Sequence, residues 1–202
     1  MHARRPPGRS GRTASAWVKR NVDVLLATLM LAVTAPILLA VCLAIVLDSP
    51  GPPLYRQWRM GRAGRPFRII KLRTMVTNAH RLGPALTQHR DPRITRVGSL
   101  LRRWSIDELP QLINVLAGHM SLVGPRPEIV SIVETYTPQQ REVFRVRPGM
   151  TGWAQVNGRD DLPIPEKLEF DREYVSRRST LMDLSIMART AGVVVSGRGT
   201  KR

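Results

Sequence analysis

The chain has little of several residue types that common functional sites require. It contains a single cysteine, Cys42, in 202 residues, which excludes an intramolecular disulfide and a cysteine-rich zinc site. Aromatic residues make up only 5% of the chain. This argues against the binding of single-stranded nucleic acid, because such binding needs aromatic side chains on which the bases stack. Acidic residues are also scarce, with 15 against 32 Lys and Arg and a formal net charge of +17. Such an excess attracts polyanions: nucleic acid, an anionic membrane face or phosphorylated small molecules.

A charge-free apolar stretch near the N-terminus, Val24–Leu47, is the strongest physical signal in the chain. As a helix it is long enough to cross the hydrocarbon core of a bilayer, which takes about 20 apolar residues. A buried helix of a soluble protein usually keeps a polar face over such a length, so membrane insertion is the better interpretation.

The proline in the middle of this stretch, Pro36, lacks a helical N–H and favours a kink. Both flanks of the stretch are basic, and the positive-inside rule places such flanks in the cytoplasm. A helix that bends at Pro36 and returns to the same leaflet satisfies both flanks, so we expect a re-entrant membrane helix. The flanking cations are Arg4, Arg5, Arg9, Arg12, Lys19 and Arg20 before it, and Arg56, Arg59, Arg62, Arg65, Arg68, Lys71 and Arg73 after it.

The rest of the chain predicts a small α+β domain that is mainly helical. Turn signals frame two short candidate strands, 54–59 and 66–72, which predict a hairpin. Lys71 and Arg73, beside the end of the second strand, have the position of substrate-binding residues. The expected organisation is a disordered basic tail, a membrane-inserted helix, a cytoplasmic catalytic region with surface amphipathic helices, and a second basic tail, at residues 1–16, 17–48, 49–196 and 197–202.

Two adjacent carboxylates, Asp107 and Glu108, stand among basic residues in a chain that is poor in acids. Ser105 and Glu108 form an S-x-x-E capping box, so helix capping alone would explain Glu108. The same position suits chemistry, because the positive end of a helix keeps a nearby carboxylate ionised. Aspartate is a known type of nucleophile for an acyl-phosphate intermediate, and its neighbour could then act as a base.

Two arginines near this pair suit the binding of phosphate. Arg102 lies a turn earlier and can neutralise phosphate oxygens through paired donors. Arg126 stands between Pro125 and Pro127, whose fixed backbone lowers the entropy lost when the guanidinium binds an anion. Together with the apolar stretch, these residues favour a phosphorylated substrate at a membrane surface.

Five stretches carry a more specific pattern: Lys19-Arg20-x-x-Asp23, GPPLYRQWRMG, PFRIIKLRTM, LRRWSIDELPQLINVLAGHMSLVGPRPE and VRPGMTGWAQVNGR. Across residues 17–196 the chain resembles the bacterial sugar transferase family, the monotopic polyprenyl-phosphate phosphoglycosyl transferases. The resemblance implies transfer of a sugar-1-phosphate from a UDP-sugar to polyprenyl (undecaprenyl) phosphate, with release of UMP. This is the first membrane step of polysaccharide or glycoconjugate assembly.

The resemblance also implies roles for particular residues. Asp107 is the implied nucleophile of a covalent aspartyl-phosphosugar intermediate and lies close to a Mg²⁺ ion, with Glu108 as the assisting base. Arg102 and Arg126 are implied contacts to the substrate phosphates or the uridine. The implied location is the bacterial inner membrane, among its lipids, with the catalytic domain facing the cytoplasm.

The membrane helix departs from the family pattern at one position. The family breaks this helix at a Ser-Pro pair, whereas this chain has Ala35 before Pro36 and Thr34 one step earlier. The proline is kept, so a break at Pro36 is still expected.

Two alternatives without catalysis stay open on the residues alone. A membrane-tethered nucleic-acid-binding protein follows from the charge and predicts salt-sensitive binding, but it leaves the Asp–Glu pair unexplained. A membrane scaffold would use Asp107 and Glu108 only to cap a helix. The sugar transferase interpretation explains both features, so we expect no nucleic-acid partner.

Overall fold

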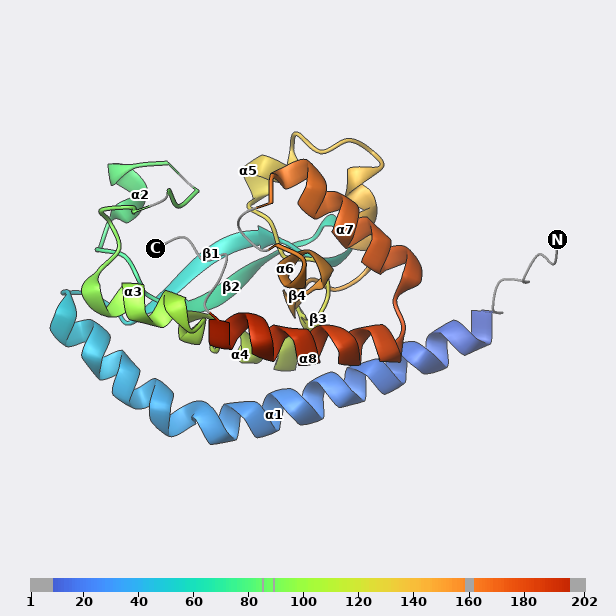
Figure 1. Ribbon diagram of the computed structural model, residues 1–202, viewed down its shortest axis with the longest axis horizontal. Coiled ribbons are helices and arrows are strands. Elements are labelled where there is room, and N and C mark those ends of the chain that lie inside the picture. The colour runs from blue at the N-terminus through green and yellow to red at the C-terminus, as the bar shows by residue number, and fades with distance from the viewer. Residues whose placement is uncertain (1–8, 85, 89, 159–161, 197–202) are drawn as a thin grey trace.

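The computed structural model describes residues 9–84, 86–88, 90–158 and 162–196. A long helix, α1 (Arg9–Asp48), runs along one side of a small domain in which helices surround two small sheets (Figure 1). This mainly helical α+β architecture confirms the predicted fold class. The elements after α1 are β1 (Leu54–Met60), η1 (Arg62–Gly64), β2 (Pro66–Leu72), α2 (Ala79–Leu82), α3 (Arg96–Arg103), η2 (Ile106–Glu108), α4 (Gln111–Leu116), β3 (Ser121–Val123), α5 (Val130–Val133), η3 (Gln140–Arg145), β4 (Gly149–Thr151), α6 (Trp153–Val156), α7 (Ile164–Arg177) and α8 (Thr180–Ser196).

Helix α1 begins earlier than expected. Residues 9–16, which were expected to belong to a disordered tail, are helical; the predicted division into domains stays a prediction. The remainder of that tail, residues 1–8, and the predicted C-terminal tail, residues 197–202, lie outside the described residues.

The expected break at Pro36 is absent, because α1 continues through this residue as a single helix. Figure 1 shows that the helix is nevertheless bent. Two local features favour bending: Pro36 cannot donate to the preceding turn, and the Thr34 hydroxyl donates to the Met30 carbonyl at 2.7 Å.

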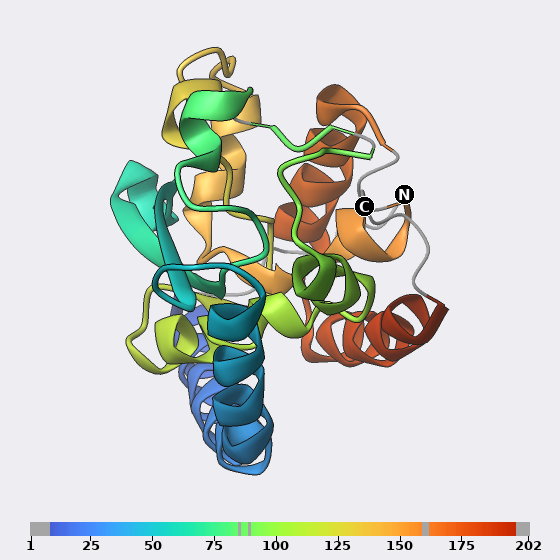
Figure 2. The same cartoon turned by 90° about the vertical axis from the view of Figure 1, so that its left-hand side faces the viewer.

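The two ends of the apolar stretch pack against the domain, whereas its middle does not. Ala27 and Ile45 are buried against the domain core. Between them, Val33 and Leu39 are 65% and 74% exposed. Figure 2 shows the helix projecting below the rest of the molecule. By length and composition, residues Ala16–Asp48 could cross a membrane.

The predicted hairpin is confirmed. Strands β1 and β2 pair antiparallel from Leu54↔Leu72 to Met60↔Pro66. The inner face of β2 contributes Phe67 and Ile69 to the main core, where α4, β3, α7 and α8 meet. Strands β3 and β4 form a short parallel pair that sequence analysis did not predict.

Asn114 of α4 fastens this helix to the hairpin. Its side chain accepts a hydrogen bond from the Ile70 N–H at 2.9 Å and donates to the Arg68 carbonyl at 2.8 Å. The amide thereby takes the place of a neighbouring strand along β2 and satisfies buried backbone groups. As a result, α4 and the turn before it are held beside the end of β2.

Candidate active site

Asp107 and Glu108 lie in η2, a single turn between α3 and α4. Ser105, just before it, has a φ of 55°, a left-handed conformation that is uncommon outside glycine. Its side chain makes no capping hydrogen bond to η2, and its N–H donates to the Arg102 carbonyl at 3.2 Å. The predicted capping box is therefore wrong, because the chain turns sharply at Ser105 instead of entering a regular helix.

The Glu108 carboxylate is held by two cations from other segments. Its Oε1 atom accepts hydrogen bonds from Lys71 Nζ at 2.7 Å and Arg126 Nη2 at 3.0 Å. Burial alone would raise the pKa of Glu108, but Arg126 and Lys71 together hold it well below its ordinary value. The structure thus joins three residues that the sequence predicted for one site, from β2, η2 and the Pro-Arg-Pro loop.

Asp107 is in a different electrostatic situation from its neighbour. It is 9% exposed, and no hydrogen bond or ion pair to its carboxylate occurs within the described ranges. Burial, reinforced by the negative charge of Glu108, raises the pKa of Asp107 to about 6. The two adjacent carboxylates therefore differ, since one is neutralised by its own ion pairs and the other remains available for reaction.

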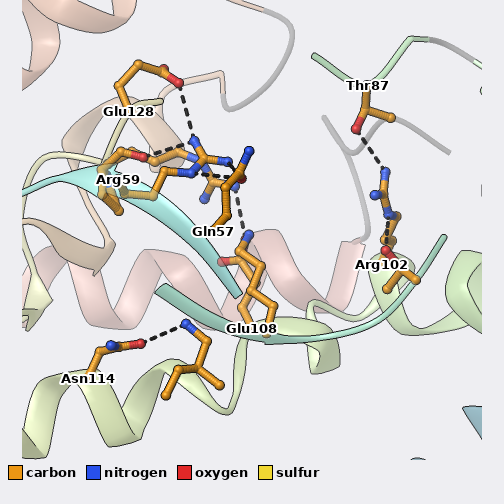
Figure 3. A network of polar contacts seen from close by, with 12 residues as sticks. Gln57, Arg59, Thr87, Arg102, Glu108, Asn114 and Glu128 are labelled. Atoms are coloured by element: carbon orange, nitrogen blue, oxygen red, sulfur yellow. Dashed lines mark hydrogen bonds and ion pairs between the residues drawn. The ribbon is translucent and has the colours of Figure 1, made fainter. Parts of the chain in front are cut away.

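Arg102 reaches the same region from α3. Thr95 caps this helix by accepting a hydrogen bond from the Gly98 N–H at 3.0 Å. A Cβ atom at Gly98 would lie 2.1 Å from the Thr74 carbonyl oxygen, so only glycine lets α3 approach this closely. One turn later, Arg102 donates to the hydroxyls of Thr74 at 2.8 Å and Thr87 at 3.3 Å, as Figure 3 shows.

Arg73 makes contacts that the sequence did not suggest. The guanidinium is buried and donates to the carbonyls of Ser49, Pro50 and Gly51, in the loop that follows α1. These bonds give Arg73 a structural task, which is to tie the end of α1 to the hairpin. Although Arg73 borders the cleft described below, its role in substrate binding stays a prediction.

Arg59 belongs to the site, although sequence analysis ranked it only among the basic flanking residues. Its guanidinium donates to Gln57 Oε1 at 2.7 Å and 3.1 Å and to Glu128 Oε1 at 3.4 Å (Figure 3). Lysines and arginines are so common in this chain that nothing in the sequence distinguishes Arg59. Its burial between Gln57 and Glu128 becomes visible only in the fold.

These groups line one cleft of about 750 Å³. Its volume lies within the range of small-molecule sites, about 300–1,000 Å³. The hairpin, α3 and η2 contribute part of its wall, and α6 and α7 contribute another part. The charged lining residues already described are Arg59, Lys71, Arg73, Arg102, Asp107, Glu108, Arg126 and Glu128.

The donor atoms of the cleft fit a magnesium ion better than a metal held by the protein alone. Within the described residues, no three His, Cys, Asp or Glu side chains lie close enough together to hold a metal. Mg²⁺ commonly uses one or two carboxylates and completes its shell with water and substrate phosphates. Asp107 can supply such a carboxylate, because no cation in the described part of the chain is bonded to it.

A cleft that combines several cations with an Asp–Glu pair, beside a long exposed apolar helix, has the composition of a phosphate-handling active site at a membrane. Comparison with known families agrees with this class. The family described as Bacterial sugar transferase matches residues 14–197. The chain therefore belongs to the bacterial sugar transferase family, and the resemblance drawn from its motifs is confirmed.

Relatives of this chain differ in the sugar that their names specify. A UDP-glucose:undecaprenyl-phosphate glucose-1-phosphate transferase of Caulobacter vibrioides is 46% identical over 194 residues, covering 92% of this chain and 73% of the relative. A protein of the same name from Escherichia coli is 46% identical over 180 residues, covering 84% and 38%. A UDP-N-acetylgalactosamine-undecaprenyl-phosphate N-acetylgalactosaminephosphotransferase of Aeromonas hydrophila is 40% identical over 197 residues, covering 92% and 45%. The chain thus spans less than half of the last two relatives.

Proposed function

We propose that this protein transfers a sugar-1-phosphate from a UDP-sugar to polyprenyl phosphate, with release of UMP. The observation that carries the proposal is the contrast within the acid pair: Glu108 is neutralised by Lys71 and Arg126, whereas no described side chain bonds to the Asp107 carboxylate. The names of the relatives support the reaction class, since they specify UDP-sugars and undecaprenyl phosphate. They name glucose in one case and N-acetylgalactosamine in another, so the sugar itself stays open.

In the first step, an oxygen of the Asp107 carboxylate attacks the phosphorus that carries the sugar. A new P–O bond to Asp107 forms, the bond to the bridging oxygen breaks, and UMP leaves with that oxygen. In the second step, a phosphate oxygen of the polyprenyl phosphate attacks the same phosphorus and displaces Asp107. The product is a polyprenyl diphosphate sugar, and the carboxylate is regenerated.

The surrounding side chains would bind and position the diphosphate. Lys71, Arg102 and Arg126 lie at the cleft and can neutralise the oxygens of the phosphoryl group that is transferred. Glu108 holds Lys71 and Arg126 on one oxygen, which fixes where their charges point. A Mg²⁺ ion at Asp107 and the substrate phosphates would add positive charge that stabilises the transition state.

The attachment of α1 supports a re-entrant membrane helix. Near one end of its apolar stretch, Arg20 donates to the carbonyls of Val115 at 2.6 Å and Leu116 at 3.0 Å. At the other end, Asp48 accepts a hydrogen bond from the Val97 N–H at 3.1 Å. A domain on one side of a bilayer cannot contact both ends of a helix that crosses it, whereas a bent helix in one leaflet permits both contacts. The basic flanks favour the cytoplasmic leaflet of the inner membrane, where the cleft would meet the phosphate of the lipid acceptor.

The proposed reaction is tested by measuring UMP. Detergent-extracted protein is incubated with polyprenyl phosphate, Mg²⁺ and each of a panel of UDP-sugars. We expect UMP release with at least one sugar, and its loss in Asp107→Asn, which keeps the shape of the side chain but not the nucleophile. Glu169→Gln, a carboxylate-to-amide change on an exposed part of α7, serves as the control and should retain wild-type release. Wild-type turnover by Asp107→Asn would refute the assignment.

The re-entrant arrangement is tested by labelling. In a Cys42→Ser background, a single cysteine replaces either Trp17, which precedes the apolar stretch, or Arg62, which follows it. Both residues are exposed. We expect a membrane-impermeant thiol reagent to label both sites only when it has access to the cytoplasm. Labelling of the residue 17 cysteine from the periplasm in intact cells would show that α1 spans the membrane.

A further inference from the structure

Two buried polar side chains on the α6–α7 wall of the cleft carry atoms that have no hydrogen-bond partner. Gln155 of α6 is 8% exposed, and neither its Oε1 nor its Nε2 atom has a partner. Asp171 of α7 is 5% exposed, and its Oδ1 atom has none. In the part of the chain that the structure describes, these are the only two buried side-chain oxygens without a partner. Buried groups of this kind normally find one, so a ligand that supplies it would account for both.

The surroundings of each residue hold its side chain in place but leave hydrogen-bonding atoms of that side chain without a partner. Asp171 accepts a hydrogen bond from the backbone N–H of Arg126, which leaves Oδ1 available on the same carboxyl group. Burial raises the pKa of Asp171 to about 8, so this carboxyl is largely uncharged near neutral pH and can donate as well as accept. The Gln155 amide lies against the backbone at Gly152, where even a Cβ atom would lie 2.9 Å from Oε1.

The rest of the cleft suits phosphate better than neutral groups. Its cations offer only hydrogen-bond donors, which match phosphate oxygens. Two other acceptors that line it are already engaged, since Glu108 binds Lys71 and Arg126, and Gln57 binds Arg59; Asp107 is reserved for the reaction with phosphorus. A UDP-sugar also carries hydroxyl groups, each of which donates and accepts. The α6–α7 wall provides groups of matching chemistry.

We propose that Gln155 and Asp171 bind hydroxyl groups of the donor, on the sugar ring or on the ribose, and thereby set its affinity; binding to the sugar ring would also set the choice of sugar. This inference rests on the proposed function for the identity of the donor. A hydroxyl binds the Gln155 amide through one donor and one acceptor, and a second hydroxyl binds Asp171 Oδ1. In this arrangement the phosphates lie against Lys71, Arg102 and Arg126.

The test compares Gln155→Met and Asp171→Asn with the exposed control Glu169→Gln in the full-length protein. Gln155→Met keeps the length of the side chain but removes both hydrogen-bonding atoms, and Asp171→Asn keeps the shape of the carboxyl. UMP release is measured with UDP-glucose, or with the sugar identified above, while donor and polyprenyl phosphate are varied in turn. We expect the KM for the donor to rise about tenfold in each variant, equivalent to about 1.4 kcal/mol. The KM for polyprenyl phosphate should stay within about twofold of wild type, as should both values in the control.

Inhibition by UDP distinguishes the two rings, because UDP has the ribose but no sugar ring. An equal rise in its inhibition constant assigns the residues to the ribose. An unchanged inhibition constant assigns them to the sugar. A donor KM within about twofold of wild type in both variants would overturn the inference, as would a rise confined to polyprenyl phosphate.

Two further measurements distinguish a loss of donor binding from an unfolded variant and from an inactive wild-type protein. Thermal unfolding shows whether a variant is folded, and if Asp171→Asn is not, Gln155→Met decides, because its amide has no hydrogen bond in the described structure to lose. If the wild-type protein releases no UMP with any sugar, the proposed reaction fails. Calorimetric binding of UDP-glucose and UDP then tests the inference by itself, and equal affinities for wild type and Gln155→Met would refute it.

Discussion

Replacement of Asp23 by alanine tests how α1 is attached to the domain. Asp23 is 5% exposed, although it precedes the apolar stretch. Its Oδ2 atom accepts a hydrogen bond from the Ser121 hydroxyl at 2.8 Å, and its Oδ1 atom accepts one from the Leu122 N–H at 3.1 Å. The carboxylate therefore connects α1 to β3, which lies in the main core. Alanine would leave the Leu122 N–H buried and unpaired, whereas the Ser121 hydroxyl could still donate to the Val123 carbonyl, which lies 3.0 Å away.

The magnitude follows from these two bonds. A hydrogen bond to a charged group contributes about 1.5–3 kcal/mol, so losing the bond from Leu122 and exchanging the bond from Ser121 for a weaker one to a neutral carbonyl should together cost about 3 kcal/mol. In a domain of this size, each kcal/mol shifts the Tm by about 2–4 °C. We therefore expect Asp23→Ala to melt about 6–12 °C below wild type in detergent, as followed by tryptophan fluorescence.

Glu169→Ala is the matched control, because it removes an exposed carboxylate and should leave the Tm within about 2 °C of wild type. A similarly small change in Asp23→Ala would refute the reasoning. It would mean that the N-terminal half of α1 is not held on the domain, and the contacts that support a re-entrant helix would lose their weight.

Three further predictions concern the domain and the proposed Mg²⁺ ion. Asn114→Ala removes both side-chain hydrogen bonds to the backbone at Ile70 and Arg68. It should lower the free energy of unfolding, measured by chemical denaturation, by about 2 kcal/mol or more, and a smaller decrease would contradict this prediction. The hydrogen bond from the Arg93 side chain holds the pKa of Asp91 below its ordinary value, so the pair stabilises the fold above about pH 4 and loses this effect as the pH falls. Wild type should therefore lose Tm more steeply than Asp91→Asn below pH 4, and parallel curves would exclude this role. Chelation by EDTA should stop UMP release and added Mg²⁺ should restore it; release that persists in EDTA would rule out the metal.

Local patterns predicted the elements that depend on local interactions. The turn signals at both ends of the hairpin placed its strands within one residue of β1 and β2. The parallel pairing of β3 with β4 escaped prediction, because each strand has three residues and its partner is remote in sequence.

The candidate site was predictable where charge and motif coincided. Lys71, Glu108 and Arg126 stood out in the sequence, and the fold brings their side chains together. Asp171 and Gln155 did not stand out, since an acid in an amphipathic helix and a glutamine in a turn are ordinary. Only their burial without partners makes them unusual, and burial depends on the tertiary fold.

The capping box shows the limit of a short motif. Ser105 and Glu108 have the spacing of a cap, but the left-handed backbone at Ser105 directs the chain into a tight turn. Instead of reaching back to Ser105, the Glu108 carboxylate forms ion pairs with Lys71 of β2 and Arg126 of the Pro-Arg-Pro loop. Long-range ion pairs thus override the local preference.

The proposed covalent bond between Asp107 and the phosphosugar is tested most directly by mass spectrometry of the intact protein. The protein is incubated with its UDP-sugar and Mg²⁺ but without polyprenyl phosphate, so that the second step cannot occur. We predict that the mass of the wild-type protein increases by one sugar phosphate, and that peptide mapping locates the added group at Asp107. The added mass should disappear when the lipid acceptor is supplied, and it should be absent from Asp107→Asn. UMP release that continues in Asp107→Asn, or an adduct on another residue, would contradict it.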